Sequence, residues 1–233
     1  MTIQQHTVLI TGANRGLGLE FTKQYAADGW QVISCCRTPE TAADLMSLAS
    51  QFKQNIQVHA LNVADFAQID ALALQLKTSK IDVLINNAGV YPESSLGNID
   101  YDDWAYGFKI NTMAPYKMAE AFTEQIAASQ LKKIVVLSSK MGSVSDNTSG
   151  GSYAYRTSKA ATNMMMKSLS IDLKTKGIAC GILHPGWVQT DMGGPNGLIT
   201  AATSVAGLRQ VISELTTSNC GRFIAFDGKE IAW

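Results

Sequence analysis

T-V-L-I-T-G-A-N-R-G-L-G, residues 7–18, is a short apolar run that ends in a turn rich in glycine. An amphipathic stretch, residues 17–28, follows the turn, so the pattern is strand, turn and helix. Glycines here let the backbone approach a ligand, and the helix N-terminus behind them offers free amides to a pyrophosphate. The segment therefore predicts a dinucleotide site, with a purely structural glycine turn as the alternative.

The same rhythm of apolar and amphipathic runs continues along the chain. Further strands are expected at residues 31–36, 56–61, 81–85, 133–137, 178–183 and 222–226, and helices at residues 40–52, 66–78 and 102–129. Strands that alternate with helices predict an α/β fold, in which a parallel sheet carries helices on both faces.

Composition excludes several classes of function. Nineteen basic residues balance nineteen acidic ones without a basic cluster, which argues against nucleic acid and anionic membranes as partners. The polar start lacks the pattern of a signal peptide, and no apolar run reaches about 18 residues, so we expect a cytoplasmic protein. The cysteines form no C-x-x-C pair and the three histidines have no metal-ligand spacing, so no metal site is predicted.

Tyr155 and Lys159 are separated by one helical turn, so both side chains project from the same face of a helix. A free tyrosine has a pKa of about 10, too high for acid–base work near neutrality, and a lysine cation nearby lowers it. The pair is a candidate proton donor, although this spacing also occurs by chance. Tyr153 competes less well, because Thr157, four residues on, carries no charge.

The end of the second predicted strand favours one dinucleotide over the other. An acid there would bind the ribose 2′-hydroxyl, whereas an arginine accommodates a 2′-phosphate. Residues 31–39 contain no acid and include Arg37, and Arg15 in the glycine turn is a second cation within reach. Both could be solvated surface residues, yet the missing acid favours NADPH.

Two further stretches suggest a site. Asn86-Asn87-Ala88-Gly89 follows an apolar run, and its small residues would let the backbone lie against a cofactor ring, with a simple chain reversal as the alternative. The polar stretch 142–152 precedes Tyr155 and is expected to fold over the site.

Together these motifs resemble those of the short-chain dehydrogenase/reductase family. They occur in the family's order: T-G-x-x-x-G-x-G at 11–18, N-N-A-G at 86–89, Asn111 in a long helix, Ser138-Ser139, Y-x-x-x-K at 155–159 and Pro185-Gly186. Residues 153–159, 185–194 and 226–233 are most similar to the C-factor and sniffer-like carbonyl reductase branch. The resemblance implies a single Rossmann-type domain over residues 1–233, a doubly wound parallel sheet of about seven strands.

The resemblance also implies a role for each matching residue. Tyr155 would protonate the substrate oxygen as hydride arrives, and Lys159 would lower its pKa and bind the nicotinamide ribose. Ser139 would hold the substrate carbonyl, because the family places its serine second in such a pair. Asn111 would belong to a water-mediated proton relay to Lys159, unless it only caps or kinks its helix.

The implied cofactor is NADP(H) in preference to NAD(H). At Asn62 the family often has aspartate near the adenine, and asparagine keeps an acceptor there. The candidate cofactor residues are Gly12, Asn14, Arg15, Gly16, Leu17, Gly18, Arg37, Asn62, Val63, Asn87, Ala88, Gly89, Tyr155, Lys159, Pro185, Gly186, Val188 and Thr190.

Tyr91, Met141, Tyr153 and Trp187 are candidates to line an apolar substrate pocket, although core packing is the favoured interpretation of Trp187. The glycine-rich segment 192–208 suggests an open, mobile pocket mouth.

The sequence thus predicts an enzyme that reduces a small ketone or aldehyde with NADPH. A redox-sensing or signalling protein of C-factor type with little turnover is the alternative. A sugar-nucleotide epimerase is disfavoured, because about 40 residues after Asp191 leave no room for a substrate domain. The family often pairs through the two helices that carry Asn111 and Tyr155, so a homodimer is possible.

Overall fold

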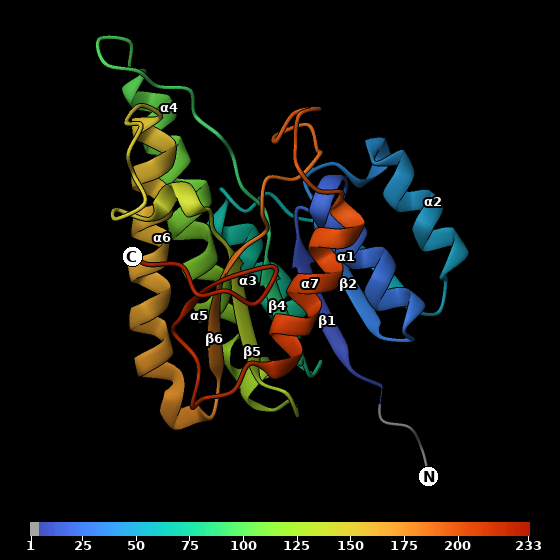
Figure 1. The fold of residues 1–233 in the computed structure, drawn as a ribbon. Helices are drawn as coiled ribbons and strands as arrows, with labels where there is room; N and C mark the ends of the chain where they lie inside the picture. The colour runs from blue at the N-terminus through green and yellow to red at the C-terminus, as the bar shows by residue number, and fades with distance from the viewer. Residues whose placement is uncertain (1–4) are drawn as a thin grey trace.

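Seven parallel strands form one sheet through the middle of the molecule, in the order β3-β2-β1-β4-β5-β6-β7 (Figure 1). The computed structural model describes residues 5–233. The strands are β1 (Thr7–Thr11), β2 (Gln31–Cys36), β3 (Ile56–Ala60), β4 (Val83–Asn86), β5 (Lys133–Leu137), β6 (Ala179–His184) and β7 (Phe223–Ala225).

Helices cover both faces of the sheet (Figure 1). One face carries α1 (Gly16–Ala27), α2 (Ala43–Gln51) and α7 (Ala201–Glu214), which bury Phe21, Leu45 and Leu208 against the strands. The other face carries α3 (Phe66–Gln75), α4 (Tyr101–Phe108), α5 (Ala114–Ala127) and α6 (Tyr153–Asp172), with Phe122 and Met166 in its core. Strands buried on both faces need the near-continuous apolar runs that the sequence shows.

The strand order indicates where a ligand crevice is expected. β1 pairs with β2 on one side and with β4 on the other, and the chain crosses between the two halves of the sheet at that point. In open parallel sheets, ligands bind beside the carboxyl ends of the strands where the order reverses. The predicted α/β class, the parallel sheet and its seven strands are confirmed.

Two predicted helices are interrupted. Residues 40–52 form a 3-10 turn, η1 (Pro39–Thr41), and then the separate helix α2. The single helix expected at residues 102–129 contains a π-helical segment, η2 (Lys109–Met113), between α4 and α5. Pro115 has no backbone N–H to donate to the carbonyl four residues earlier, which explains a break at this point.

The polar stretch 142–152 makes two sets of contacts. Ser143 Oγ donates to the carbonyl oxygen of Ala232, and the backbone amide of Ser145 donates to that of Trp233, so this stretch is bound to the end of the chain. Its last residue, Ser152, contacts Tyr91 beside the catalytic tyrosine candidate. In residues 5–233, no helix combines the length and the apolar character needed to cross a bilayer.

Candidate active site

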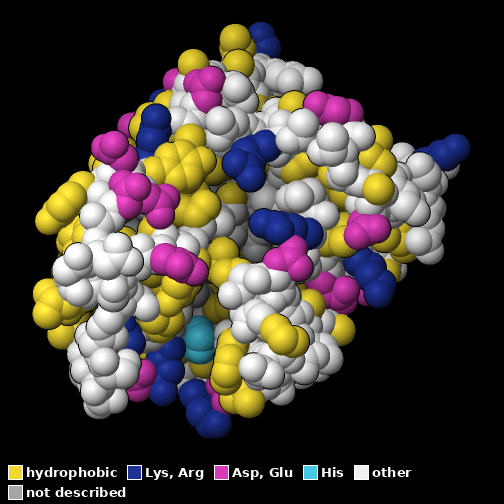
Figure 2. All heavy atoms as spheres, turned by 90° about the horizontal axis from the view of Figure 1, so that it is seen from above, with side chains coloured by type: hydrophobic (Ala, Val, Ile, Leu, Met, Phe, Trp, Pro, Cys, Tyr) yellow, Lys and Arg dark blue, Asp and Glu magenta, His cyan; other side chains and the backbone are white. Residues whose placement is uncertain are grey.

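The glycine turn lies against the chain segments that follow β4 and β6. Gly12 and Gly16 have φ angles of +67° and +53°, which favour glycine. A Cβ at Gly12 would lie 3.0 Å from the Cα of Ala88, and one at Gly16 would lie 3.5 Å from a methyl group of Thr190. The predicted dinucleotide motifs therefore meet at the carboxyl edge of the sheet, where Figure 2 shows a hollow between hydrophobic and basic side chains.

This turn fits the pyrophosphate of a nicotinamide dinucleotide. A Cβ at Gly18 would lie 2.1 Å from the carbonyl oxygen of Gly12, so only glycine allows the helix to start this close to the turn. Arg15, the N-cap of α1, places no side chain on the first amides, and the first turn contains no acid. These amides and the positive end of the helix dipole are available to an anion.

Asn87, which follows β4, is hydrogen-bonded to the glycine turn after β1. Its Nδ2 donates to the carbonyl oxygens of Thr11 and Gly12, at 2.8 and 3.1 Å. Thr11 Oγ1 in turn accepts the backbone amides of Asn87 and Ala88. The side chain of Asn87 thus supports the shape of the cofactor turn, and any contact of this residue with the cofactor must use its remaining groups.

The two candidate phosphate-binding arginines differ in their surroundings. Arg37 directly follows β2, is exposed, and has no hydrogen-bond or ion-pair partner within residues 5–233. Arg15 donates to Asp191 Oδ2 over 2.7 Å, in a pair that is exposed on both sides. The guanidinium of Arg37 is therefore unpaired within the described residues, whereas that of Arg15 is already engaged by Asp191.

Ser139 and Ser138, adjacent at the end of β5, point in different directions. Ser138 Oγ is buried and donates to Asn163 Oδ1 over 2.6 Å. Ser139 caps the 3-10 turn η3 (Lys140–Gly142), and its hydroxyl is close enough to the phenol of Tyr155 to influence the pKa of that group. The structure therefore brings the second serine, not the first, to the tyrosine.

The pKa of Tyr155 is raised to about 12, mainly because the phenol is buried. The nearby hydroxyl of Ser139 acts to lower this pKa and is outweighed. The sequence predicted a pKa lowered by Lys159, and that prediction is wrong for this structure, since loss of solvent at Tyr155 dominates. At neutral pH the phenol keeps its proton.

Lys159 lies one turn below Tyr155 on α6, with Nζ 5.6 Å from the centre of the phenol ring. Its Nζ donates to the carbonyl oxygen of Leu137 over 2.8 Å. Burial lowers the pKa of this amine to about 8. A Cβ at Gly89 would lie 3.7 Å from Nζ and 3.2 Å from Asn111 Oδ1, so these three residues converge.

The side-chain amide of Asn111 is hydrogen-bonded to the backbone of a neighbouring segment. Its Oδ1 accepts the amide of Val90 and its Nδ2 donates to the carbonyl oxygen of Val90 and to Ser158 Oγ. Its own carbonyl oxygen accepts Thr162 Oγ1 over 2.8 Å, in place of the helical donor that Pro115 lacks. Asn111 thus lies at the helix irregularity that the sequence offered as the alternative, and its part in a proton relay stays a prediction.

The remaining cofactor candidates lie in the segments that follow β3 and β6. Asn62 follows β3, and its Oδ1 accepts the amide of Ala64; Val63 is buried in the core. Gly186, after β6, has a φ of +83°. Pro185, Val188 and Thr190 belong to the same crossing segment, and the hydroxyl of Thr190 accepts the amide of Gly193.

The four substrate candidates are placed unequally. The ring of Tyr91 lies 4.4 Å from that of Tyr155, centre to centre, and Met141 follows Ser139 in η3. Tyr153 opens α6 and is partly exposed. Trp187 is 51% exposed and donates to the carbonyl of Gly193, so the favoured interpretation of core packing is wrong.

The glycines after Trp187 serve packing as well as bending. A Cβ at Gly193 would lie 2.0 Å from the carbonyl oxygen of Val188, and one at Gly197 would lie 2.5 Å from the amide of Gln189. Val188 also forms a bridge to Ile199. The predicted pocket mouth is therefore a folded segment in which glycine permits close backbone contact.

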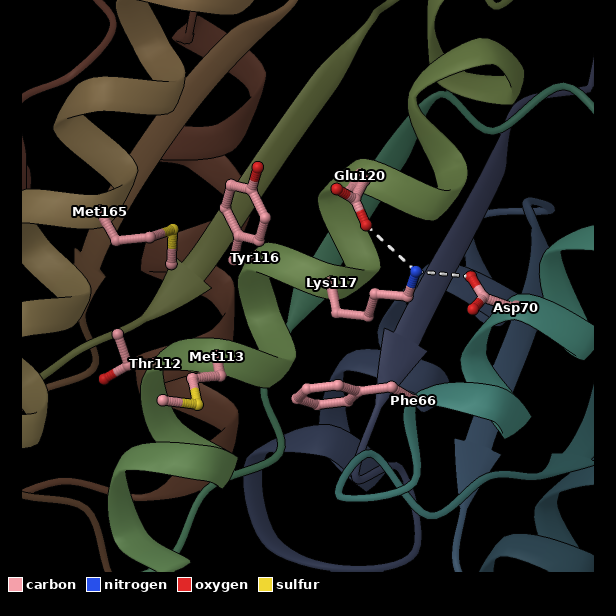
Figure 3. Close-up of a pocket in the computed structure, with 8 residues that line it drawn as sticks. All are labelled: Phe66, Asp70, Thr112, Met113, Tyr116, Lys117, Glu120 and Met165. Carbon is pink, nitrogen blue, oxygen red and sulfur yellow. Dashed lines mark hydrogen bonds and ion pairs between the residues drawn. The ribbon is translucent and has the colours of Figure 1, made fainter. Parts of the chain in front are cut away.

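A second hollow lies away from these motifs, between α3, the η2–α5 helix and α6 (Figure 3). Its cavity volume is about 560 Å³. Its charged lining consists of Lys117 and the two acids with which it pairs, Asp70 and Glu120. It is lined by Phe66, Asp70, Thr112, Met113, Tyr116, Lys117, Glu120 and Met165.

Sequence reasoning missed several residues that support the site. Ser158 and Thr162 bind Asn111, and Asn163 binds Ser138. A signal was available: positions three and seven residues after Tyr155 lie on the same helix face, and they are Ser158 and Thr162. No local signal pairs Asn163 with Ser138, because the two are 25 residues apart and meet only through packing.

Comparisons with known proteins agree with this geometry. The sequence model for short chain dehydrogenase matches residues 6–198. C-signal of Myxococcus xanthus is 44% identical over 164 residues, 70% of this chain and 99% of that protein. Carbonyl reductase Sniffer of D. melanogaster superposes with a TM-score of 0.91 at 35% identity, covering 99% of this chain and 100% of that one. The NADPH-bound carbonyl reductase from chicken fatty liver has a TM-score of 0.93, with the same identity and coverage.

Proposed function

The chain belongs to the short-chain dehydrogenase family, whose members are NAD(P)-dependent oxidoreductases, and from that premise we propose that it uses NADPH to reduce a ketone or aldehyde to an alcohol. One observation carries the proposal: a buried Tyr155 close to the hydroxyl of Ser139. It lies next to Lys159 and beside a glycine turn that fits a dinucleotide.

The residues divide the work of the reduction. The nicotinamide supplies the hydride when it is bound. Tyr155 donates its phenolic proton to the substrate oxygen, and a positioned acid of this kind contributes about 10²–10⁴ in rate. Ser139 Oγ donates to the same oxygen as negative charge develops there. Burial raises the pKa of Tyr155 and so weakens the phenol as an acid, and its role as proton donor is supported by its position beside Ser139 and Lys159.

Lys159 acts on the cofactor side of the site. An ammonium group has three protons, and one of them binds the carbonyl oxygen of Leu137. The others can bind ribose hydroxyls near Gly89, whose backbone approaches Nζ closely. This gives Lys159 a positioning role that does not depend on lowering the pKa of the tyrosine.

The preference for NADPH over NADH is part of the proposal. Arg37, exposed and free of partners within residues 5–233, supports it, as does the absence of an acid from β2. The chicken carbonyl reductase named above binds NADPH, which agrees with the assignment.

The test is turnover of a panel of ketones and aldehydes by the wild type and by Tyr155→Phe. The variant should lose activity and keep its affinity for NADPH. Tyr106→Phe, which removes a hydroxyl from a partly exposed tyrosine of α4, is the matched control and should keep full activity. Full activity in Tyr155→Phe would overturn the mechanism.

A dinucleotide-binding signalling protein is the second candidate. The identity of 44% with a protein named C-signal favours it. It predicts tight NADPH binding by the wild type without turnover of any carbonyl compound in the panel.

We also propose that the chain forms a homodimer through α5 and α6. Met113, Tyr116 and Met164 expose large apolar side chains on the η2–α5 helix and α6. Met113 and Tyr116 also line the hollow of Figure 3. A second copy would cover these side chains.

A further inference from the structure

The segment of residues 90–94, called the strap here, crosses the start of α6 and is fastened at three points. The side chain of Asn111 binds both the amide and the carbonyl oxygen of Val90. Tyr91 Oη and Ser152 Oγ form a hydrogen bond of 2.7 Å. Ser94 Oγ accepts the backbone amide of Ala154 over 2.8 Å. Two of the three contacts therefore reach the first residues of the helix that carries Tyr155.

The ring of Tyr91 covers the ring of Tyr155. Their centres are 4.4 Å apart and their planes are tilted by 37°. Tyr155 is only 7% exposed, whereas Tyr91 is 40% exposed. Tyr91 therefore separates the phenol of Tyr155 from solvent on one side, and it is near enough that its own charge, when ionised, raises the pKa of Tyr155.

Ser152 occupies an unusual position at the start of this helix. It is the N-cap of α6 but gives no side-chain hydrogen bond to the helix, and its backbone is left-handed, with φ 45° and ψ 42°. A non-glycine residue in this region carries backbone strain that the surroundings must maintain. Its hydroxyl is hydrogen-bonded to Tyr91 and does not cap the helix. Ser94 of the strap caps it instead, because Ser94 Oγ accepts the amide of Ala154.

We propose that the Tyr91–Ser152 hydrogen bond is a latch that fixes the strap over the start of α6 and thereby positions Tyr155 for proton transfer. This inference rests on the proposed function. Tyr91 and Ser152 are positioning residues: they act through Tyr155. Opening the latch frees the ring of Tyr91, admits water to the face of Tyr155 and loosens the first turn of α6.

The first measurement is hydrogen exchange of the backbone amides in the protein without added cofactor, which does not depend on turnover. Ala154 and Arg156 are the reporters, because their amides bond to Ser94 Oγ and to the carbonyl oxygen of Ser152. Tyr91→Phe and Ser152→Ala should each speed exchange there by about fivefold, as loss of one ordinary hydrogen bond would. Tyr106→Phe is the control and should leave exchange unchanged.

The second measurement is a double-mutant cycle on turnover. Each single variant should lower kcat by about tenfold, as expected for a misplaced catalytic group. The double variant should fall no further than either single one, because the two changes break the same contact. The Kd for NADPH should change little, since neither Tyr91 nor Ser152 is among the cofactor candidates.

The outcomes separate the latch from the enzyme assignment. Faster exchange at Ala154 and Arg156 with an unchanged kcat would show a merely structural contact and overturn the positioning role. Unchanged exchange, or additive losses of kcat, would show that the latch does not exist. A wild type without turnover would overturn the proposed function, and the exchange data would then decide on the latch alone.

Discussion

Lys159 Nζ donates a 2.8 Å hydrogen bond to the carbonyl oxygen of Leu137, which joins the middle of α6 to the last residue of β5. The amine is buried, and burial lowers its pKa from 10.5 to about 8. The folded protein therefore holds a cation at neutral pH in a place that disfavours charge, which costs stability.

This cost should appear as a pH dependence of unfolding. Between pH 8 and pH 10.5 the unfolded chain keeps a proton on Lys159 that the folded chain has released, so the free energy of unfolding rises with pH. Relative to Lys159→Met, the wild type should gain about 3 kcal/mol across this window. Denaturant titrations at several pH values measure it. The exposed Lys77→Met is the control, and a parallel course for wild type and Lys159→Met would contradict the prediction.

Alanine substitution of the two adjacent serines, one at a time, should separate an effect on kcat from an effect on the free energy of unfolding. Ser139→Ala removes the hydroxyl beside Tyr155 and should lower kcat by about 10²-fold, the effect of losing one oxyanion donor. Ser138→Ala leaves Asn163 Oδ1 without its buried donor and should lower the free energy of unfolding by about 1–3 kcal/mol. Steady-state kinetics and denaturant unfolding of both variants test this. Equal losses of kcat would refute the assignment.

Arg37 should determine the choice of cofactor. The wild type should bind NADPH at least about tenfold more tightly than NADH, which is about 1.4 kcal/mol, and Arg37→Asp should lose this preference. Fluorescence titration with both cofactors measures it. Lys77→Asp makes the same change of charge. Lys77 follows α3 and lies toward the amino ends of the strands, away from Arg37, so this variant should keep the preference. If neither cofactor binds the wild type, the glycine turn is only structural.

The apolar surface of α5 and α6 should hold two copies together. Tyr116→Glu combined with Met164→Glu places charge on this surface and should convert a dimer to a monomer in analytical ultracentrifugation. Met46→Glu, a similar change on α2, should leave the dimer intact. A monomeric wild type would refute the interface.

The strands and most helices could be predicted because their signals are local. The apolar runs at residues 31–36 and 133–137 coincide with β2 and β5, since hydrophobic periodicity is a property of short segments. The helix expected at residues 102–129 shows the limit. Its π-helical segment depends on Pro115 and on the contact of Asn111 with Val90, 21 residues away.

In the candidate site, too, features that depend on local spacing could be predicted and contacts between distant residues could not. Tyr155, Lys159 and the glycine turn could be found from spacing, whereas the contact of Tyr91 with Tyr155 could not, because 64 positions separate them. The sequence favours a buried Trp187 because a tryptophan is usually buried, and only the packed chain shows that this one is exposed.

By itself, the sequence determined the α/β class, the dinucleotide turn and the pair of tyrosine and lysine on one helix face, because backbone freedom and helical spacing are encoded over a few residues. Only the tertiary structure showed that Ser138 turns to Asn163, and that the pKa of Tyr155 is raised. It also decided that a strap closes over the start of α6. These properties depend on burial and on contacts between distant segments, which exist only once the sheet and its helices have packed together.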